Sequence, residues 1–171
     1  MGFKTIALGR HSASIGRETK TNGIYSLAQG YLSYANGIAS ISMGYKSKTC
    51  KSYSVAIGKS NNSFGVNSVT LGNSLISKSY SETALGMFNT DVTGNKDSWI
   101  AEDRLFTIGN GKNTNERSDA VTVLKNSDMF LEGNLSINKN VNISGNLKVK
   151  GKVNLSDTLS VSKNSYLSYV N

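Results

Sequence analysis

Apolar and polar positions alternate along the first half of the chain, and small residues recur there at a fixed step of seven. In Ser54-Val-Ala-Ile-Gly58, alternation places Ser54 and Ala56 on one face of an extended strand and Val55 and Ile57 on the other. The small-residue series contains only Ala, Ser and Thr: Ala7, Ser14, Thr21, Ala28, Ala35, Ser42, Thr49, Ala56, Ser63, Thr70, Ser77 and Ala84. This pattern predicts a row of short strands with a narrow interior.

Glycine marks the same repeat at twice that step. One series comprises Gly2, Gly16, Gly30, Gly44, Gly58, Gly72 and Gly86, and a second comprises Gly9, Gly23, Gly37 and Gly65, with Lys51 and Ser79 in its two gaps. We expect glycine after each strand to supply a turn, where a positive φ or a close backbone approach is needed. The sequence therefore predicts an all-β solenoid of 14-residue coils with two strands per coil.

The two strands of each coil differ in their outward residues. Ten of the twelve positions that flank the small residues are apolar in one phase, against six of twelve in the other. The apolar stripe comprises Ile15, Leu27, Ile41, Met43, Val55, Ile57, Val69, Leu71 and Leu85. Such a stripe on a thin rod should not stay exposed, so we expect self-association with closed cyclic symmetry.

These residues carry a family resemblance. Ser54–Gly58 and Asn67-Ser-Val-Thr-Leu-Gly72-Asn-Ser resemble the head repeats of trimeric autotransporter adhesins, and the resemblance extends over about residues 2–88. It implies a left-handed parallel β-roll, three chains about a threefold axis, and the apolar stripe as the trimer interface. The chain shows no heptad-repeat stalk or membrane-anchor barrel, so the resemblance supports the head architecture rather than a secretion pathway.

A different repeat, of six residues, occupies residues 133–171. Its apolar positions are Leu135, Ile137, Val141, Ile143, Leu147, Val149, Val153, Leu155, Leu159 and Val161. A strip with one apolar side cannot close a core alone. The segment resembles the intertwined triple β-helices in the shafts of phage and viral tail fibres. A single-chain hexapeptide β-helix, as in acyltransferases, is the alternative, but it needs more coils and its catalytic histidine is absent.

A non-periodic β connector, residues 87–132, separates the head (1–86) from the shaft (133–171). It should contain strands at 104–109 and 119–125 around a polar loop, Asn110–Ser118. Trp99 fits a packed junction better than a ligand site. The segment Asp103–Gly111 resembles connectors that follow such heads in fibre-like proteins.

Composition and charge narrow the function classes. Only 37% of the residues are hydrophobic, and the chain has 17 glycines and no proline, which argues against a helical bundle or a large enzyme with a thick core. The single cysteine, Cys50, rules out an internal disulfide framework. The net charge divides as +7 in the head, −3 in the connector and +4 in the shaft, which sums to +8. No apolar run is long enough to predict a membrane span.

The sequence contains no clear match to the enzyme motifs that were considered. His11, the only histidine, fits a surface turn better than a catalytic arrangement, and Gly109-Asn-Gly111-Lys112 lacks the spacing of a phosphate-binding loop. The carboxylates Glu102, Asp103, Glu116 and Asp119 lie near Arg104 and Arg117, which favours ion pairing over acid–base catalysis. We expect no enzyme, no cofactor and no metal site.

Residues one coil apart should stack, and this places Arg17, Tyr31, Tyr45 and Lys59 in one row, with Tyr25 and Tyr53 at another turn position. Flat rings beside cations suit sugar rings that bear acidic groups. The alternative is that an aromatic row only stiffens the edge of the solenoid.

Together these patterns indicate a homotrimeric fibre or spike tip that attaches to a cell surface. The leading interpretation is a receptor-binding fibre on a virion or phage surface, with a bacterial cell-surface adhesin fragment or a purely structural spacer as alternatives. Expected partners are the chain itself, a host surface glycan or protein receptor, and other virion or fibre proteins. We expect no nucleic-acid partner and no membrane insertion.

Overall fold

Every strand in the described part of the chain lies between Gly2 and Leu131. A computed structural model describes residues 1–157 and 160, which form two units, Met1–Leu135 and the described residues from Ser136 onward. These residues contain strands and turns but no helix, and none of their segments forms a helix long and apolar enough to span a bilayer. The predicted all-β class is confirmed.

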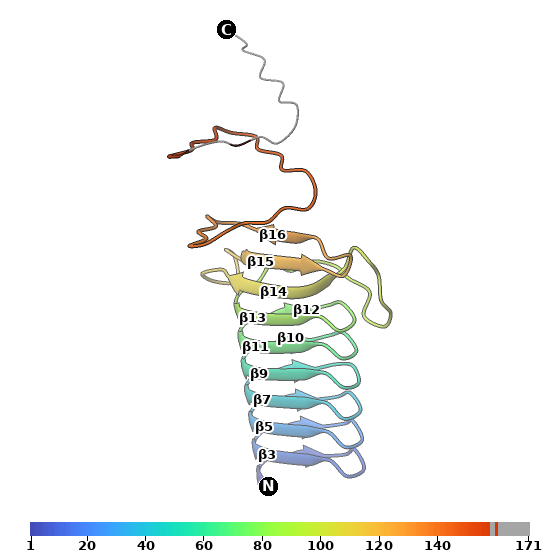
Figure 1. The fold of residues 1–171 in the computed structure, drawn as a ribbon. Coiled ribbons are helices and arrows are strands. Elements are labelled where there is room, and N and C mark those ends of the chain that lie inside the picture. Colours follow the sequence, from blue (N-terminus) through green and yellow to red (C-terminus); the bar gives the residue numbers. More distant parts are fainter. Residues whose placement is uncertain (158–159, 161–171) are drawn as a thin grey trace. The chain divides into compact units, whose positions relative to one another are not determined.

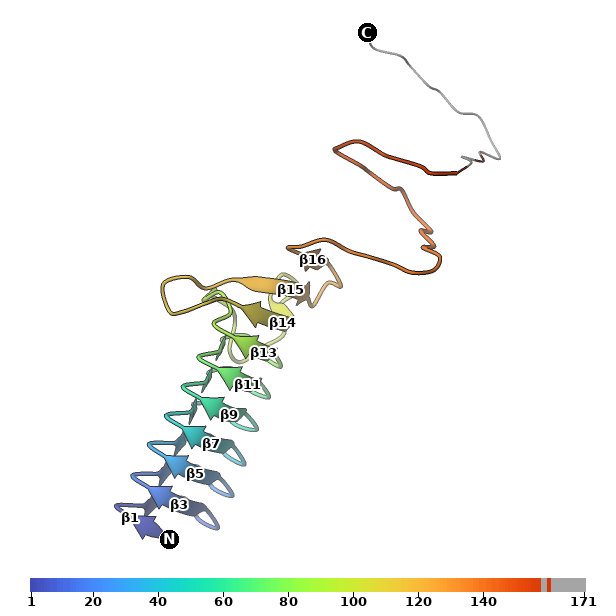
Figure 2. The same cartoon turned by 90° about the vertical axis from the view of Figure 1, so that its left-hand side faces the viewer.

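The first unit is a parallel solenoid in which each coil contributes one long and one short strand (Figures 1 and 2). One sheet, which we call the long-strand sheet, contains β1 (Gly2–Phe3), β3 (Ala13–Arg17), β5 (Leu27–Tyr31), β7 (Ile41–Tyr45), β9 (Val55–Lys59), β11 (Val69–Asn73) and β13 (Thr83–Met87). The short strands are β2 (Ile6–Ala7), β4 (Lys20–Thr21), β6 (Tyr34–Ala35), β8 (Lys48–Thr49), β10 (Asn62–Ser63) and β12 (Ile76–Ser77). Residues that face each other on adjacent parallel strands, such as Gly44 in β7 and Gly58 in β9, are 14 residues apart in the sequence, which confirms the predicted coil length.

The interior of the solenoid is filled by small side chains. The predicted Ala/Ser/Thr series is buried from Ser14 to Ala84, while Ala7 in the first coil is exposed. A second buried series, also with a step of seven, was not predicted: Thr19, Ser26, Ser33, Ser40, Ser47, Ser54, Asn61, Ser68, Leu75, Glu82 and Asn89. Serines of this series donate hydrogen bonds to turn carbonyls, as Ser26 Oγ does to Gly23 O at 2.7 Å. The core is therefore largely polar, and most of its hydroxyl groups find hydrogen-bond partners inside the solenoid.

The glycines of the first series do not form the turns, as the sequence had suggested. From Gly16 to Gly86, each is the fourth residue of a five-residue strand, with φ of 111° at Gly44. The left-handed turn residues that follow these strands, such as Leu32 and Lys46, are not glycines. What the glycine provides is close approach, because a Cβ on Gly44 would lie 2.1 Å from Gly58 O in the next coil. The turn expectation was wrong for this series, and the close-approach expectation is confirmed.

Replacing Gly44 with Ala should destabilise the solenoid by about 2–4 kcal/mol, because the backbone clash adds to the strain of a positive φ. Urea denaturation followed by circular dichroism would measure the loss. Gly133→Ala is the matched control, since no atom lies within 4 Å of a Cβ at that position. Equal stability of the two variants would show that the coils do not need glycine for their spacing.

The long-strand sheet continues beyond residue 86. Strand β14 (Arg104–Asn110) pairs with β13 in parallel and in the register of the coils, with Phe106 opposite Thr83 and Gly109 opposite Gly86. Strands β15 (Asp119–Leu124) and β16 (Met129–Leu131) follow in antiparallel order. The two strands predicted around the loop Asn110–Ser118 are therefore present, and the first of them is also a further long strand of the solenoid.

In the second unit, residues 136–157 and residue 160 contain no strand. Their apolar side chains are exposed within the single chain, as at Leu147, which is 71% exposed. Leu159 and Val161 of the six-residue repeat lie outside the described residues. The triple β-helix shaft therefore stays a prediction.

Candidate functional site

The outer face of the long-strand sheet carries the residues that the sequence predicts to mediate assembly. Alternation directs the first, third and fifth residues of each five-residue strand outward, because the second residue is the buried small one. We call the first and third positions the assembly face. All nine predicted stripe residues lie in it, and its aliphatic side chains are only partly covered within one chain, as at Ile57, which is 38% exposed.

The register of β14 extends the assembly face by one more strand. Phe106 and Ile108 lie opposite Thr83 and Leu85, so they continue its two rows. Sequence reasoning missed them because the glycines Gly86 and Gly109 are 23 residues apart instead of 14. The segment Phe106-Thr-Ile-Gly109 nevertheless keeps the spacing of the repeat, and this was the signal that could have identified it.

A shallow groove of about 370 Å³ runs beside the middle of the assembly face. It is lined by Gln29, Gly30, Met43, Gly44, Ile57 and Gly58. Because glycine has no side chain, the glycine row leaves a hollow between the third and fifth outward positions. Such a hollow can receive side chains from a neighbouring molecule.

The fifth outward position holds the predicted ligand row. Arg17, Tyr31, Tyr45 and Lys59 end strands β3, β5, β7 and β9 and are direct neighbours in register. The rings of Tyr31 and Tyr45 have centroids 5.4 Å apart, and the Arg17 guanidinium lies 5.5 Å from the Tyr31 ring. The structure therefore brings these four residues together, on the same face as the assembly positions.

Two additional residues belong to this row or touch it. Phe3 pairs with Arg17 in register, and the guanidinium lies 5.5 Å from its ring. Lys46 Nζ lies 5.2 Å from the ring centroid of Tyr45. Sequence reasoning missed both, although Phe3 stands 14 residues before Arg17 and could have been found from that spacing.

Tyr25 and Tyr53, the other predicted ligand residues, lie at the opposite end of the long strands. Each is in the turn before its strand, with φ of 59° and 61°, and Ala39 occupies the same turn position in the coil between them. Tyr25 stacks on the ring of His11, with centroids 5.3 Å apart. The six predicted ligand residues therefore form two separate rows and not one site.

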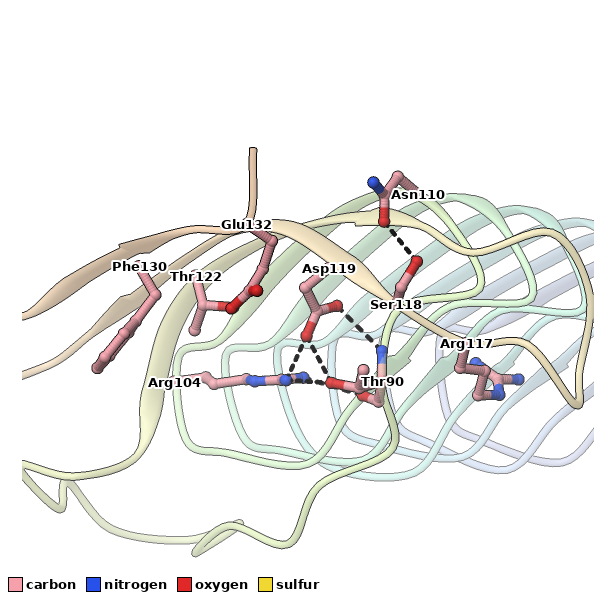
Figure 3. Close-up of a pocket in the computed structure, with 9 residues that line it drawn as sticks. All are labelled: Thr90, Arg104, Asn110, Arg117, Ser118, Asp119, Thr122, Phe130 and Glu132. Atoms are coloured by element: carbon pink, nitrogen blue, oxygen red, sulfur yellow. Dashed lines mark hydrogen bonds and ion pairs between the residues drawn. The ribbon is translucent and has the colours of Figure 1, made fainter. Parts of the chain in front are cut away.

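The connector contains a pocket of about 570 Å³, shown in Figure 3. Its lining residues are Thr90, Arg104, Asn110, Arg117, Ser118, Asp119, Thr122, Phe130 and Glu132. Arg104 and Asp119 form an ion pair with both side chains 8% exposed, and Thr90 N donates to Asp119 Oδ1 at 3.0 Å. Arg117 Nη1 donates to the carbonyl oxygens of Ser74 and Asn89. These groups tie the connector to the solenoid.

The carboxylates considered for catalysis do not converge. Asp119 pairs with Arg104, Glu116 pairs with Lys112, and the Asp103 carboxylate lies near Lys125. Within residues 1–157 and residue 160, no group of three or more His, Cys, Asp or Glu residues is arranged to hold a metal ion. The pairing of Asp119 with a nearby arginine agrees with the expectation of ordinary ion pairing.

The comparison with protein families identifies the solenoid. The family model described as YadA head domain repeat matches twice, at residues 22–47 and 51–74, which contain strands β5 to β7 and β9 to β11. No curated protein matches the chain. The repeats indicate an adhesin-like function, and both they and the solenoid are structural rather than enzymatic in character. The chain thus carries the head repeats of trimeric autotransporter adhesins, in a parallel β-solenoid of about six 14-residue coils.

Proposed function

We propose that this chain is the head of a homotrimeric surface adhesin, in which three copies pack their assembly faces around a common axis. The observation that carries the proposal is the mainly apolar character of that face, from Ile15 to Ile108, with side chains that one chain leaves partly exposed. A stripe of this kind is stable in water only when another surface covers it. A second copy presents the same surface, and cyclic symmetry satisfies all copies equally.

The opposite face supports the same arrangement. Polar residues in the short strands or directly after them include Lys20, Asn22, Asn36 and Lys48. Asn22 Nδ2 donates to Asn36 Oδ1 at 2.6 Å along the solenoid. Charged and amide side chains are suited to contact with water. The difference between the two faces therefore orients each chain, with the long strands inward and the short strands outward.

The family match favours a bacterial surface adhesin over the virion fibre that was the leading interpretation of the sequence. The matched repeats are those of bacterial trimeric autotransporter adhesins, whereas the virion interpretation rested on the fibre-like character of both repeats taken together. We therefore propose the bacterial cell surface as the location and attachment to another surface as the role. In this proposal residues 133–157 bury their alternating apolar side chains between three chains.

For the attached ligand we propose an acidic glycan, bound along the row Arg17, Tyr31, Tyr45 and Lys59. The Arg17 side chain is exposed, Tyr45 and Lys59 are exposed, and the two tyrosine rings present adjacent flat surfaces. Because the row flanks the groove, it lies at the margin of the assembly face. A long polymer could bind there along the axis of the solenoid. The +7 charge of residues 1–86 adds long-range attraction that salt should weaken.

Replacing Tyr31 and Tyr45 together with Ser should weaken binding of the head to immobilised heparin by about tenfold or more, since stacking and cation–π contacts contribute up to about 2 kcal/mol. Surface plasmon resonance at low and high salt would measure the change. Tyr34→Ser, in short strand β6, is the matched control and should bind as the parent does.

Parental binding by the double variant, with its oligomeric state intact, would reject this row as the ligand site. The tyrosines would then only stiffen the edge of the solenoid. The loop Asn110–Ser118 would be the next site to test.

A further inference from the structure

Three buried polar atoms without a hydrogen-bond partner belong to residues in or next to strands β13, β14 and β15, where the β14–β15 hairpin closes the solenoid. Among residues 1–157 and residue 160, the buried side-chain atoms without a hydrogen-bond partner are Glu82 Oε1, Thr107 Oγ1 and Lys125 Nζ. Glu82 directly precedes β13, Thr107 lies in β14, and Lys125 directly follows β15. These neighbouring strands lie at the top of the stacked coils in Figure 1. Unpartnered buried groups are costly, so their presence at one end of the solenoid needs an explanation.

Lys125 faces Asp103 across the open end of this hairpin. The backbone N–H of Lys125 donates to Asp103 O at 3.0 Å, so the two residues are held opposite each other. The Lys125 side chain is 0% exposed, and its Nζ lies 3.9 Å from Asp103 Oδ2, beyond hydrogen-bond distance. The pair is therefore near contact, but it lacks the close geometry that makes a buried ion pair favourable.

The burial of Lys125 affects the protonation of its amine. Burial lowers the pKa of this amine, although the charges of Asp103 and Glu82 act in the opposite direction. A neutral, desolvated lysine is a nucleophile, whereas an ammonium group is not. Glu82 precedes Thr83, which faces Phe106 of β14, and Phe106 in turn faces Val123 of β15, so Glu82 and Lys125 lie at the same end of three adjacent strands.

Glu82 occupies a position where most coils have a serine or threonine. Its Oε2 accepts the backbone N–H groups of Lys78 and Ser79 at 2.7 and 2.9 Å, which leaves Oε1 free. Burial raises the pKa of this carboxyl, so it can hold and exchange a proton. Ser40 and Ser68, at equivalent positions, satisfy their turns with a hydroxyl, so the repeat itself does not require a carboxyl group.

We propose that Lys125 and Asp103 form an intramolecular isopeptide bond, with Glu82 as the group that transfers the protons. One proton first passes from the Lys125 ammonium to the Asp103 carboxylate, which gives a neutral amine and a carboxylic acid. Nζ then attacks Cγ of Asp103, and a new N–C bond forms. The backbone N–H of Asn95, which donates to Asp103 Oδ2 at 2.8 Å, stabilises the negative charge that develops on that oxygen. Glu82 takes a proton from Nζ and delivers one to Oδ1.

The C–Oδ1 bond then breaks and Oδ1 leaves as water, while Oδ2 remains as the amide carbonyl oxygen. One amine and one carboxylic acid give one amide and one water, so the step needs no oxidant, metal or activated co-reactant. The product would join the outer ends of β14 and β15 covalently. It would fix the hairpin that caps the solenoid by removing the entropy of closing that loop.

The test is the mass of the purified full chain, measured intact after denaturation. We expect a deficit of one water, about 18 Da, relative to the sequence. Trypsin should release residues 97–104 joined to residues 118–139, because cleavage after an acylated Lys125 is blocked. A parental mass equal to that of the sequence, with free 118–125 and 126–139 peptides, would overturn the proposal.

Variants separate the roles of the three residues. Asp103→Ala and Lys125→Arg should each restore the full mass. Glu82→Gln should restore it too while preserving the fold, since the amide oxygen of Gln can still accept from Lys78 and Ser79. A cross-link in Glu82→Gln at the parental extent would overturn the role of Glu82.

The chain also contains an internal control. Lys112 Nζ lies 3.5 Å from Glu116 Oε2, closer than the Lys125 pair, but the two side chains are 83% and 59% exposed. This pair should remain unlinked because water solvates both groups. A cross-link at Lys112 as well would indicate non-specific dehydration and would contradict a site built by burial.

Discussion

Replacing Ile57 with Asp should convert the proposed trimer into a folded monomer. Ile57 lies at the third position of β9 in the centre of the assembly face, so its substitute would place a carboxylate between three chains. Burying an unpaired charge costs several kcal/mol, and the symmetry repeats this cost three times. Within one chain the position is outward and partly exposed, so the solenoid itself should survive.

Sedimentation velocity would measure the change, with circular dichroism to confirm the β structure. Asn62→Asp is the matched control, because Asn62 lies in the same coil on the opposite, short-strand face. This control should sediment as the parent does. An Ile57→Asp variant that sediments as the parent does would show that the assembly face is not the interface.

Replacing Asp119 with Ala should lower the free energy of unfolding by about 3–5 kcal/mol, because the buried Arg104 guanidinium would lose its counter-charge. Thr90 would lose its acceptor at the same time. The double variant Arg104→Met/Asp119→Leu should recover most of the loss, since apolar residues of similar size need no partner.

Urea denaturation of the parent, the single variant and the double variant gives the three values. The account requires the single variant to be the least stable of the three. A double variant no more stable than Asp119→Ala would show that the hydrogen bonds to Thr90, rather than the unpaired charge, determine the stability of the connector.

The solenoid could be predicted from the sequence because its physical constraint repeats in every coil. A narrow interior admits only small side chains, so Ser14, Ala28 and Ser42 reveal the period directly. The second buried series was harder to find, because serine is common throughout the chain and Leu75 and Glu82 break its composition. The extension of the sheet through β14 was missed because the longer interval after Gly86 interrupts the count.

The surface rows could be predicted for the same reason, since residues 14 apart must stack in a solenoid. This placed Tyr31 beside Tyr45 correctly, but it could not show that both share a face with Ile57. The burial of Glu82 and Lys125 had no signal in the sequence. It arises from the packing of a hairpin against the last coil, and that contact joins segments with no shared repeat.

The central claim is that three chains cover one another's assembly faces. The most direct measurement is the molar mass of the full chain in solution, by light scattering coupled to size-exclusion chromatography over a range of concentrations. The account predicts a single species of three times the chain mass of 18.3 kDa, and a stable species of 18.3 kDa at every concentration would contradict it.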